Sequence, residues 1–153
     1  MIKAVAVLKT DTVKGVINFE QSINGGITTI NINISGVPTG SHGFHIHEYG
    51  DLSEGCVSAG THFNPFGESH GDINDNEKHI GDLGNLVADS SGIIKTILFS
   101  DISLIGQYSV IGRSIMLHEN PDDLGKTNHP LSKTTGNSGS RIACAVIGIA
   151  KNI

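Results

Sequence analysis

Apolar and polar residues alternate along several stretches of the chain. The clearest case is residues 30–35, where isoleucine occupies every second position and Asn or Ser the positions between. This period of two predicts a β-strand with one buried and one solvated face. Residues 13–19 are predicted to pair with it, because Asn24-Gly25-Gly26 tolerates the positive φ of a hairpin turn. Further strands are predicted at residues 3–8, 43–48, 83–88, 93–100, 114–119 and 141–149.

Eight predicted strands without a long helix indicate an all-β protein, either a sandwich or a barrel. The composition agrees, because 20 of the 153 residues are glycine and tryptophan is absent. Two long stretches, residues 49–81 and 120–140, are rich in Gly, Asn, Asp, Ser and Pro and match no element. Loops of this length in a compact domain usually either carry function or show that the assignment of elements is wrong.

Size and charge narrow the classes of protein further. The 153 residues are predicted to form one domain, residues 1–153, with a core of its own. The net charge of -5 argues against nucleic acid or an anionic membrane as the partner. The first residues hold too short an apolar stretch for a secretory signal, and no apolar run is long enough to span a bilayer. We therefore expect a soluble, cytoplasmic protein.

Six histidines and one aspartate have a spacing that can hold two metal ions with one shared ligand. Imidazole selects transition metals such as copper and zinc, whereas calcium and magnesium prefer oxygen ligands. Three of the imidazoles and the carboxylate lie within residues 62–82, which is enough for a closed tetrahedral zinc site that would order the first long loop. The seven candidates are His45, His47, His62, His70, His79, Asp82 and His118.

Strand geometry supports part of this cluster. His45 and His47 lie two apart on a predicted strand, so both rings project from one face while Phe44 and Ile46 face the core. Alone, such a pair fits two surface histidines equally well. His118 lies on another predicted strand, where a lone histidine is more often structural than a ligand. The metal hypothesis therefore depends on the joint pattern.

The two cysteines, Cys56 and Cys144, are too few for a thiolate zinc site and too far apart for a redox Cys-x-x-Cys pair. In cytosol the usual state is two reduced, buried thiols. The residues alone therefore favour free thiols over a bridge.

Several motifs, taken in order, closely resemble those of the copper/zinc superoxide dismutases. The resemblance covers almost the whole chain, including both ends, AVAVL at 4–8 and VIGIA at 146–150, as in a complete single-domain member. The other motifs are GFHIHEYGD at 43–51, GC at 55–56, SAGTHFNP at 58–65, HIGDLGN at 79–85, DDLG at 122–125 and GNSGSRIAC at 136–144.

The resemblance implies an eight-stranded Greek-key β-barrel or sandwich, immunoglobulin-like in architecture, with two long functional loops. It also implies one copper and one zinc ion per subunit. The copper ligands would be His45, His47, His62 and His118, and the zinc ligands His62, His70, His79 and Asp82.

The implied activity is the conversion of two superoxide anions and two protons into dioxygen and hydrogen peroxide. In this family oxidised copper takes an electron from one superoxide and returns it to a second. His62, the bridge, is expected to leave copper on reduction, to take a proton and later to donate it, so it is a catalytic residue as well as a ligand.

Other residues receive roles from the same resemblance. Asp122 would link a copper histidine to a zinc histidine and fix the ring orientations. Arg141 would dock superoxide beside copper, and Lys133 would add a steering field that weakens with salt. The resemblance reverses the interpretation of the cysteines, because Cys56 and Cys144 match the family's intrachain disulfide.

Three histidine and loop features stand outside this scheme. His42 matches a position that supports the backbone, and His129 matches no ligand. Residues 129–132 read His-Pro-Leu-Ser, where many animal members carry acidic residues, and Lys133 falls one position earlier than in many of them. This departure affects the strength of steering but not the chemistry.

The resemblance also implies partners. Five small or aliphatic residues match positions at the family's two-fold contact, so a homodimer is expected. Superoxide is the expected substrate and a copper-delivery protein a further partner, with no role for nucleic acid or membrane. The contact residues are Gly50, Ile111, Gly112, Gly148 and Ile149.

Two other functions compete with this one. A catalytically silent relative could sequester copper or occupy a copper-delivery partner, and a measurement of activity separates it from the enzyme. A zinc hydrolase is the weaker alternative, because a zinc ion closed by four protein ligands leaves no position for water.

Overall fold

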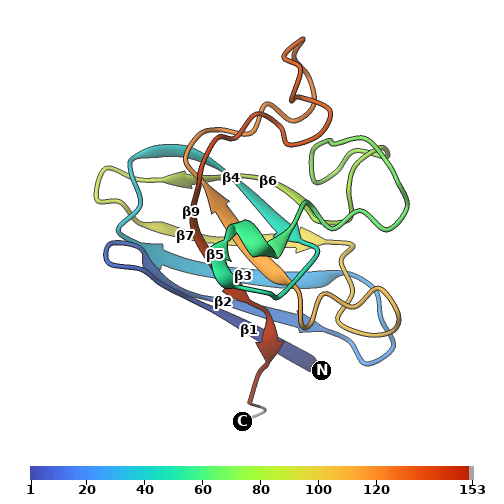
Figure 1. Cartoon of the computed structure of the whole chain (residues 1–153). Helices are drawn as coiled ribbons and strands as arrows, with labels where there is room; N and C mark the ends of the chain where they lie inside the picture. The colour runs from blue at the N-terminus through green and yellow to red at the C-terminus, as the bar shows by residue number, and fades with distance from the viewer. Residues whose placement is uncertain (152–153) are drawn as a thin grey trace.

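Two antiparallel β-sheets face each other across a single hydrophobic core in the computed structural model, which describes residues 1–151 (Figure 1). The first sheet has the order β10-β1-β2-β3-β7 and the second β6-β4-β8-β9. The strands are β1 (Ile2–Lys9), β2 (Lys14–Gln21), β3 (Thr28–Ser35), β4 (Gly40–His47), β5 (Ser53–Cys56), β6 (Asp82–Ala88), β7 (Ile94–Ser100), β8 (Ser114–His118), β9 (Arg141–Val146) and β10 (Gly148–Ile149).

β7, the edge strand beside β3 in the first sheet, contacts β6, the edge strand beside β4 in the second. The chain therefore runs through β4, β6 and β7 and returns beside β3, which is a Greek-key order. The all-β, two-sheet prediction is confirmed. Within residues 1–151, no helix is long and apolar enough to cross a membrane.

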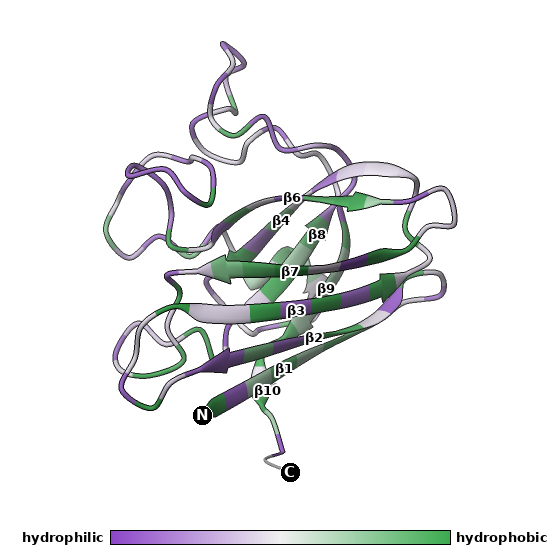
Figure 2. Ribbon diagram, turned by 180° about the vertical axis from the view of Figure 1, so that it is seen from behind, coloured by the Kyte–Doolittle hydropathy of each residue, from purple (hydrophilic) through white to green (hydrophobic). Residues whose placement is uncertain are grey.

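The core is formed by the alternate residues of each strand that point inward. On β3 the isoleucines point inward, with exposed fractions of at most 1%, while Asn31 and Asn33 face solvent. Figure 2 shows the same bands of hydrophobic and hydrophilic residues along the neighbouring strands of the first sheet. Each residue that turns apolar surface inward contributes about 1.5–3 kcal/mol when fully buried.

The last predicted strand, residues 141–149, is in fact two strands in different sheets. β9 pairs with β8, whereas β10 pairs with β1. The change occurs at Ile147, whose N–H and C=O bond to Arg113 and Gly112 in a preceding loop. The prediction of one strand was wrong because the apolar run continues across the point where the chain changes sheets. The change of pairing partner does not alter the pattern of apolar and polar residues.

The long stretch at residues 49–81 was predicted to contain no element, but it holds two short ones. β5 is a four-residue strand, and a 3-10 helix at Val57–Ala59 follows it directly. Both are too short and too exposed to give a periodic pattern. The second long stretch, residues 120–140, contains no strand or helix.

β5 and the 3-10 helix of the first long loop lie in front of the strands in the view of Figure 1. The rest of this loop and the second long loop lie beyond the second sheet, on the side away from the first. They cover the face of β4 that does not point into the core, so that the residues His42–His47 are buried on both faces. A histidine on the outer face of β4 or β8 is therefore enclosed between a sheet and a loop, and the loops form the walls of the candidate site.

Candidate metal centre

β4 presents two histidines to the loops and two apolar residues to the core. Phe44 and Ile46 are fully buried in the hydrophobic core, opposite Leu117 and Ile115 of β8. His45 and His47 occupy the alternate positions and project from the other face, as the period of a strand requires.

His118 ends β8 at an irregularity, because the register with β9 shifts between Leu117 and His118. Its ring lies 4.8 Å from that of His45 and 5.8 Å from that of His47, measured between centroids. His62 reaches the same place from the first long loop, because His47 and His62 form an isolated antiparallel bridge. Four imidazoles from two strands and one loop therefore meet.

Each of these four rings leaves one nitrogen without a partner. The unpaired atoms are His45 Nδ1, His47 Nε2, His62 Nε2 and His118 Nε2, and each is buried with no hydrogen bond among the described residues. Ligand atoms of the four side chains lie within 4.8 Å of one another. Buried nitrogens normally have a partner, so four orphans pointing at one place fit a metal ion.

The second nitrogen of two of these rings explains why the unpaired nitrogen carries a free lone pair. His47 Nδ1 lies 2.9 Å from the carbonyl of Gly60, and His118 Nδ1 lies 3.2 Å from that of Gly139. A carbonyl only accepts, so it fixes the ring proton on Nδ1 and leaves Nε2 as a lone pair. The two rings are therefore held in the tautomer that a metal requires.

A second cluster shares His62. Its Nδ1 lies 3.0 Å from His79 Nδ1 and 3.0 Å from Asp82 Oδ1. Asp82 Oδ1 is also 2.8 Å from His70 Nδ1 and 3.3 Å from His79 Nδ1. Four ligand atoms at this spacing suit a closed tetrahedral zinc site.

His45 competes with His79 for membership of this second cluster. Ligand atoms of His45, His62, His70 and Asp82 lie within 4.8 Å of one another. We assign His79 instead, because His45 Nε2 is occupied by Asp122 at 2.6 Å and its Nδ1 is one of the four orphans.

Asp122 joins the two clusters. Its Oδ2 lies 2.6 Å from His45 Nε2 and its Oδ1 2.7 Å from His70 Nε2. Asn85 holds Asp122 from behind, because its amide donates to the Asp122 carbonyl and accepts from the Asp122 N–H. The carboxylate therefore fixes one ring of each cluster.

Burial and charge set the protonation of the rings before metal enters. Burial, aided by His62, lowers the pKa of His47 to about 2, and burial lowers the pKa of His118 to about 4. Despite burial, bonds to Asp122 and Asp82 raise the pKa of His70 to about 9. Bonds from His62, His70 and His79 hold the pKa of Asp82 well below its usual value, although burial opposes them.

Arg141 begins β9 at the edge of the histidine cluster. Its two Nη groups donate to the carbonyls of Cys56 and Gly60, each at 2.7 Å. Cys56 is bonded to Cys144 of the same strand, so the predicted disulfide is present and no described cysteine is free. The disulfide and the two hydrogen bonds hold the guanidinium against the first long loop.

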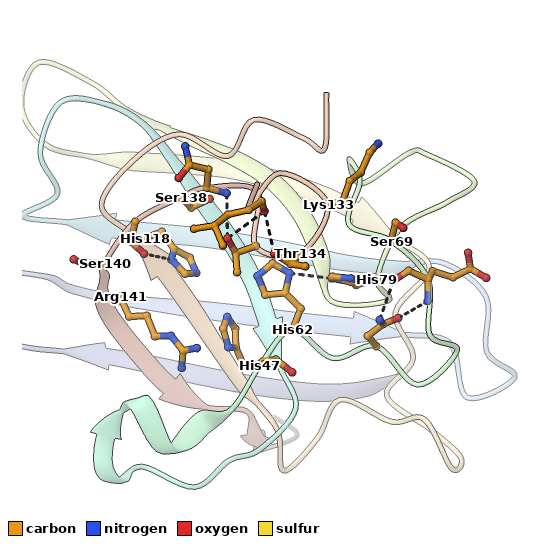
Figure 3. A pocket seen from close by; sticks show the side chains of 17 residues that line it. His47, His62, Ser69, His79, His118, Lys133, Thr134, Ser138, Ser140 and Arg141 are labelled. Carbon is orange, nitrogen blue, oxygen red and sulfur yellow. Dashed lines mark hydrogen bonds between the residues drawn. The ribbon is translucent and has the colours of Figure 1, made fainter. Parts of the chain in front are cut away.

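Arg141 lines an open pocket of about 940 Å³ together with four of the clustered histidines (Figure 3). His47, His62, His118 and Arg141 lie together in it, whereas the side chain of Lys133 points away from the histidines at the rim. The backbone of Lys133 is fixed, because its carbonyl accepts a bond from the N–H of His70.

The remaining histidines lie outside the two clusters. Both ring nitrogens of His42 face backbone carbonyls, those of His118 and Pro38, as a supporting role predicts. His129 is exposed, and its Nδ1 accepts from the Leu131 N–H.

Two residues that support the site were not predicted from the sequence. Gly60 accepts bonds from both His47 and Arg141, and Asn85 holds Asp122 in place. Both lie in the SAGTHFNP and HIGDLGN motifs, which were the only available signal. A backbone carbonyl carries no residue-type signature, so its role needs coordinates.

The fold and the two adjoining clusters describe a β-sandwich protein in which His62 lies between two groups of side chains that could each hold a metal ion. Comparison with known proteins identifies its family. The family model for copper/zinc superoxide dismutase matches residues 13–147. The chain is 54% identical over 153 residues to the extracellular superoxide dismutase of Onchocerca volvulus, covering 97% of this chain and 76% of the relative.

Two further relatives and a solved structure agree. Superoxide dismutase 3 of Arabidopsis thaliana is 50% identical over 151 residues, covering 97% of this chain and 91% of the relative. Superoxide dismutase 5 of Dictyostelium discoideum is 49% identical over 152 residues, covering 98% and 99%. The crystal structure of the clock protein EA4 superposes with a TM-score of 0.93 at 49% identity, covering 97% and 94%.

The chain belongs to the copper/zinc superoxide dismutase family. It is an oxidoreductase that acts on superoxide with copper and zinc as its cofactors.

Proposed function

We propose that His45, His47, His62 and His118 hold one copper ion per chain. The observation that carries this assignment is the convergence of four buried, unpaired imidazole nitrogens. An all-imidazole site suits copper.

We further propose that His62, His70, His79 and Asp82 hold one zinc ion per chain. Three imidazoles and a carboxylate would close this site and leave no position for water, as in a structural zinc site. His62 would serve both groups, because its Nε2 is one of the unpaired nitrogens and its Nδ1 lies beside His79 and Asp82. A cation at each nitrogen would favour loss of both ring protons.

A copper ion held by these residues would supply one-electron chemistry toward superoxide. The chain supplies a proton carrier, because His62 Nε2 can take up a proton and pass it to the reduced oxygen species while Nδ1 remains among the zinc donors. Asp122 keeps the rings of His45 and His70 oriented throughout, since it bonds to both.

We propose that Arg141 docks superoxide. Its guanidinium is always charged, and its two bonds to carbonyls leave three of its five N–H donors for an anion. Lys133 at the rim adds a local positive field on a chain whose net charge is -5.

The test combines metal content with turnover. Wild type is expected to contain one copper and one zinc per chain and to consume superoxide rapidly. Arg141→Glu should keep both metals and lose at least tenfold in rate, because an anion would replace the docking cation. Lys95→Glu, the same change in charge on β7, is the control and should stay near wild type. An unaffected Arg141→Glu enzyme would remove Arg141 from the mechanism.

We propose that two copies form a homodimer through a surface around β10. Gly50 lies against Gly112 and Val146, since a Cβ on Gly50 would meet both of them. Gly148 pairs with β1 beside them, and Ile111 packs against the core. Large apolar side chains are exposed nearby, and such patches mark contact surfaces. Their exposed fractions are 52% for Tyr49, 75% for Val57, 41% for Val146 and 82% for Ile149.

The cytoplasmic location and the copper-delivery partner stay predictions. The Onchocerca relative is named extracellular, and disulfides are usual outside the cytosol. Fractionation of cells that express the native gene decides the location. Copper loading of the purified protein with and without a copper-delivery protein decides the partner.

We also keep the assignment of residues 1–153 to one domain, supported by the single core that both sheets share.

A further inference from the structure

Met116 is a buried residue that lies outside the hydrophobic core. It is 0% exposed, yet it is not part of the core cluster to which its neighbours Ile115 and Leu117 belong. The alternation of side chains along β8 explains this, because Ile115 and Leu117 face the core and Met116 therefore faces the other side. His118 projects from that same side. The thioether of Met116 thus lies on the face of the sheet that carries the histidines.

The strand register places Met116 among the histidines of the proposed copper site. On β4, His45 pairs directly with Met116, and His47 pairs with Ser114, two residues before it. Directly opposite residues have Cβ atoms about 4.5–5.5 Å apart, and diagonal neighbours are about 7–8 Å apart. His118 follows Met116 by two residues on the same face of β8. Three of the four histidines therefore neighbour Met116 in the sheet.

The rings that neighbour Met116 are close to one another. The ring centroids of His45 and His118 are 4.8 Å apart, and those of His45 and His47 are 6.3 Å apart. Ligand atoms of these three side chains and of His62 lie within 4.8 Å of one another. Methionine is unbranched and has three rotatable bonds, so its sulfur can adjust toward an ion held at this place.

No other sulfur atom of the chain is available there. The chain has two cysteines and two methionines. Cys144 on β9 pairs with Met116 from the other side, but its sulfur is bonded to that of Cys56. Met1 precedes β1 in the first sheet and is 67% exposed. Met116 therefore carries the one soft donor beside the histidines.

A thioether distinguishes between the two oxidation states of copper. It is a soft, neutral ligand that selects Cu(I), whereas imidazole suits a wider range of metal ions. While His62 Nε2 holds a proton, that nitrogen has no lone pair to give, and three imidazoles remain. The thioether of Met116 is a fourth donor for this state.

We propose that Met116 is a further ligand of the copper site, whose thioether binds the reduced ion and not the oxidised one. Because it favours the reduced state, it raises the reduction potential of the site. This inference rests on the copper site proposed above for His45, His47, His62 and His118.

X-ray absorption at the copper edge tests this contact on the copper- and zinc-loaded protein. In wild type reduced with ascorbate, we expect a sulfur neighbour of copper in addition to imidazole nitrogens, and in the oxidised protein no sulfur neighbour. Met116→Leu conserves side-chain volume and should lose the sulfur signal. Titration of thiols in each sample verifies that the disulfide is intact, so that a cysteine cannot supply the sulfur.

The affinity for copper gives a second readout. Met116→Leu should bind Cu(I) at least about tenfold more weakly in competition with a Cu(I) chelator, while its Cu(II) affinity stays within about twofold of wild type. A tenfold loss for Cu(I) alone lowers the reduction potential by about 59 mV. Leu117→Met is the control, since it makes the reverse exchange at the next position, which is 0% exposed and faces the core. It should keep the wild-type affinities and potential.

Two results would overturn this inference and leave the histidine site standing. They are reduced wild-type protein whose copper is bound by nitrogen alone, and an unchanged Cu(I) affinity in Met116→Leu. Absence of imidazole nitrogen around the copper of wild type would mean that the proposed copper site itself fails, and this inference with it.

Discussion

At the scale of single residues, three histidines of the proposed copper site each give one nitrogen to the protein and leave the other unpaired. His47 and His118 each give Nδ1 to a backbone carbonyl, and His45 gives Nε2 to Asp122. The acceptor selects the tautomer, so the free lone pair is ready before an ion arrives. His62 differs, because both of its nitrogens face ligand clusters. This difference supports the proposal that His62 is the shared ligand.

We expect the hydroxyl of Ser138 to destabilise the fold. It is 1% exposed, and its hydroxyl has no partner among the described residues. An unpaired buried hydroxyl costs about 1–3 kcal/mol, so Ser138→Ala is expected to raise the free energy of unfolding by about 1 kcal/mol in urea denaturation. Ser132→Ala is the matched control. The buried hydroxyl of Ser132 donates to Asp123, and its loss should destabilise by a similar amount. A loss of stability in Ser138→Ala would contradict this account.

The histidines predict a stability maximum for the metal-free protein near pH 6.5. The folded pKa values of His47 and His118, about 2 and about 4, lie below the unfolded value of about 6.5. Below pH 6.5 the unfolded chain therefore binds more protons than the folded chain. The free energy of unfolding decreases as the pH is lowered. The pKa of His70, raised to about 9, acts in the opposite direction, because its contribution is lost as pH rises from 6.5 to 9.

Denaturant unfolding of metal-free protein between pH 4.5 and 9 measures this curve. The copper- and zinc-loaded protein is the comparison, since bound metal competes with protons for the same nitrogens and should delay the loss on the acid side. A metal-free protein that becomes more stable from pH 6.5 to 5 would be inconsistent with the buried, neutral rings.

At the scale of elements, β9 connects the site to the disulfide. Arg141 and Cys144 lie on this one strand, and each is attached to the loop that carries Cys56 and Gly60. The disulfide therefore orders the loop whose carbonyls hold both Arg141 and His47.

Removing this bridge is expected to destabilise the protein strongly. Cys56 and Cys144 are separated by 88 residues, and closing such a loop contributes about 4–5 kcal/mol in the chain-entropy model. The Cys56→Ala/Cys144→Ala variant should lose about this free energy in denaturant unfolding. Wild type with a reduced bridge should match the variant. A difference below about 1 kcal/mol between wild type and variant would show that the bridge does not restrain the unfolded chain.

Elements with a clear period were predictable from the sequence, and elements set by tertiary contacts were not. The alternation at residues 30–35 located β3, whereas the switch between β9 and β10 depends on bonds from Ile147 to a distant loop. In the site, the spacing of the histidines and the sequence motifs identified the seven ligand candidates. The choice between His45 and His79 in the second cluster required Asp122, whose position is fixed by Asn85. Such contacts join residues far apart in sequence and leave no local pattern.

At the scale of the whole molecule, the surface around β10 predicts self-association. Ile149 is 82% exposed there. Wild type is expected to sediment as a dimer at micromolar concentration, and Ile149→Asp as a monomer, because a charge would be buried without a partner. Ile97→Asp is the control, since Ile97 is 50% exposed on β7 in the first sheet and should leave the dimer intact. A wild-type monomer would refute the proposed contact.

The shared ligand is the central claim, and a crystal structure of the oxidised protein loaded with copper and zinc tests it most directly. Anomalous scattering at the two absorption edges identifies each ion. We expect His62 Nε2 within about 2.0–2.1 Å of copper and His62 Nδ1 at a similar distance from zinc. A His62 ring bound to only one of the two ions would contradict the account.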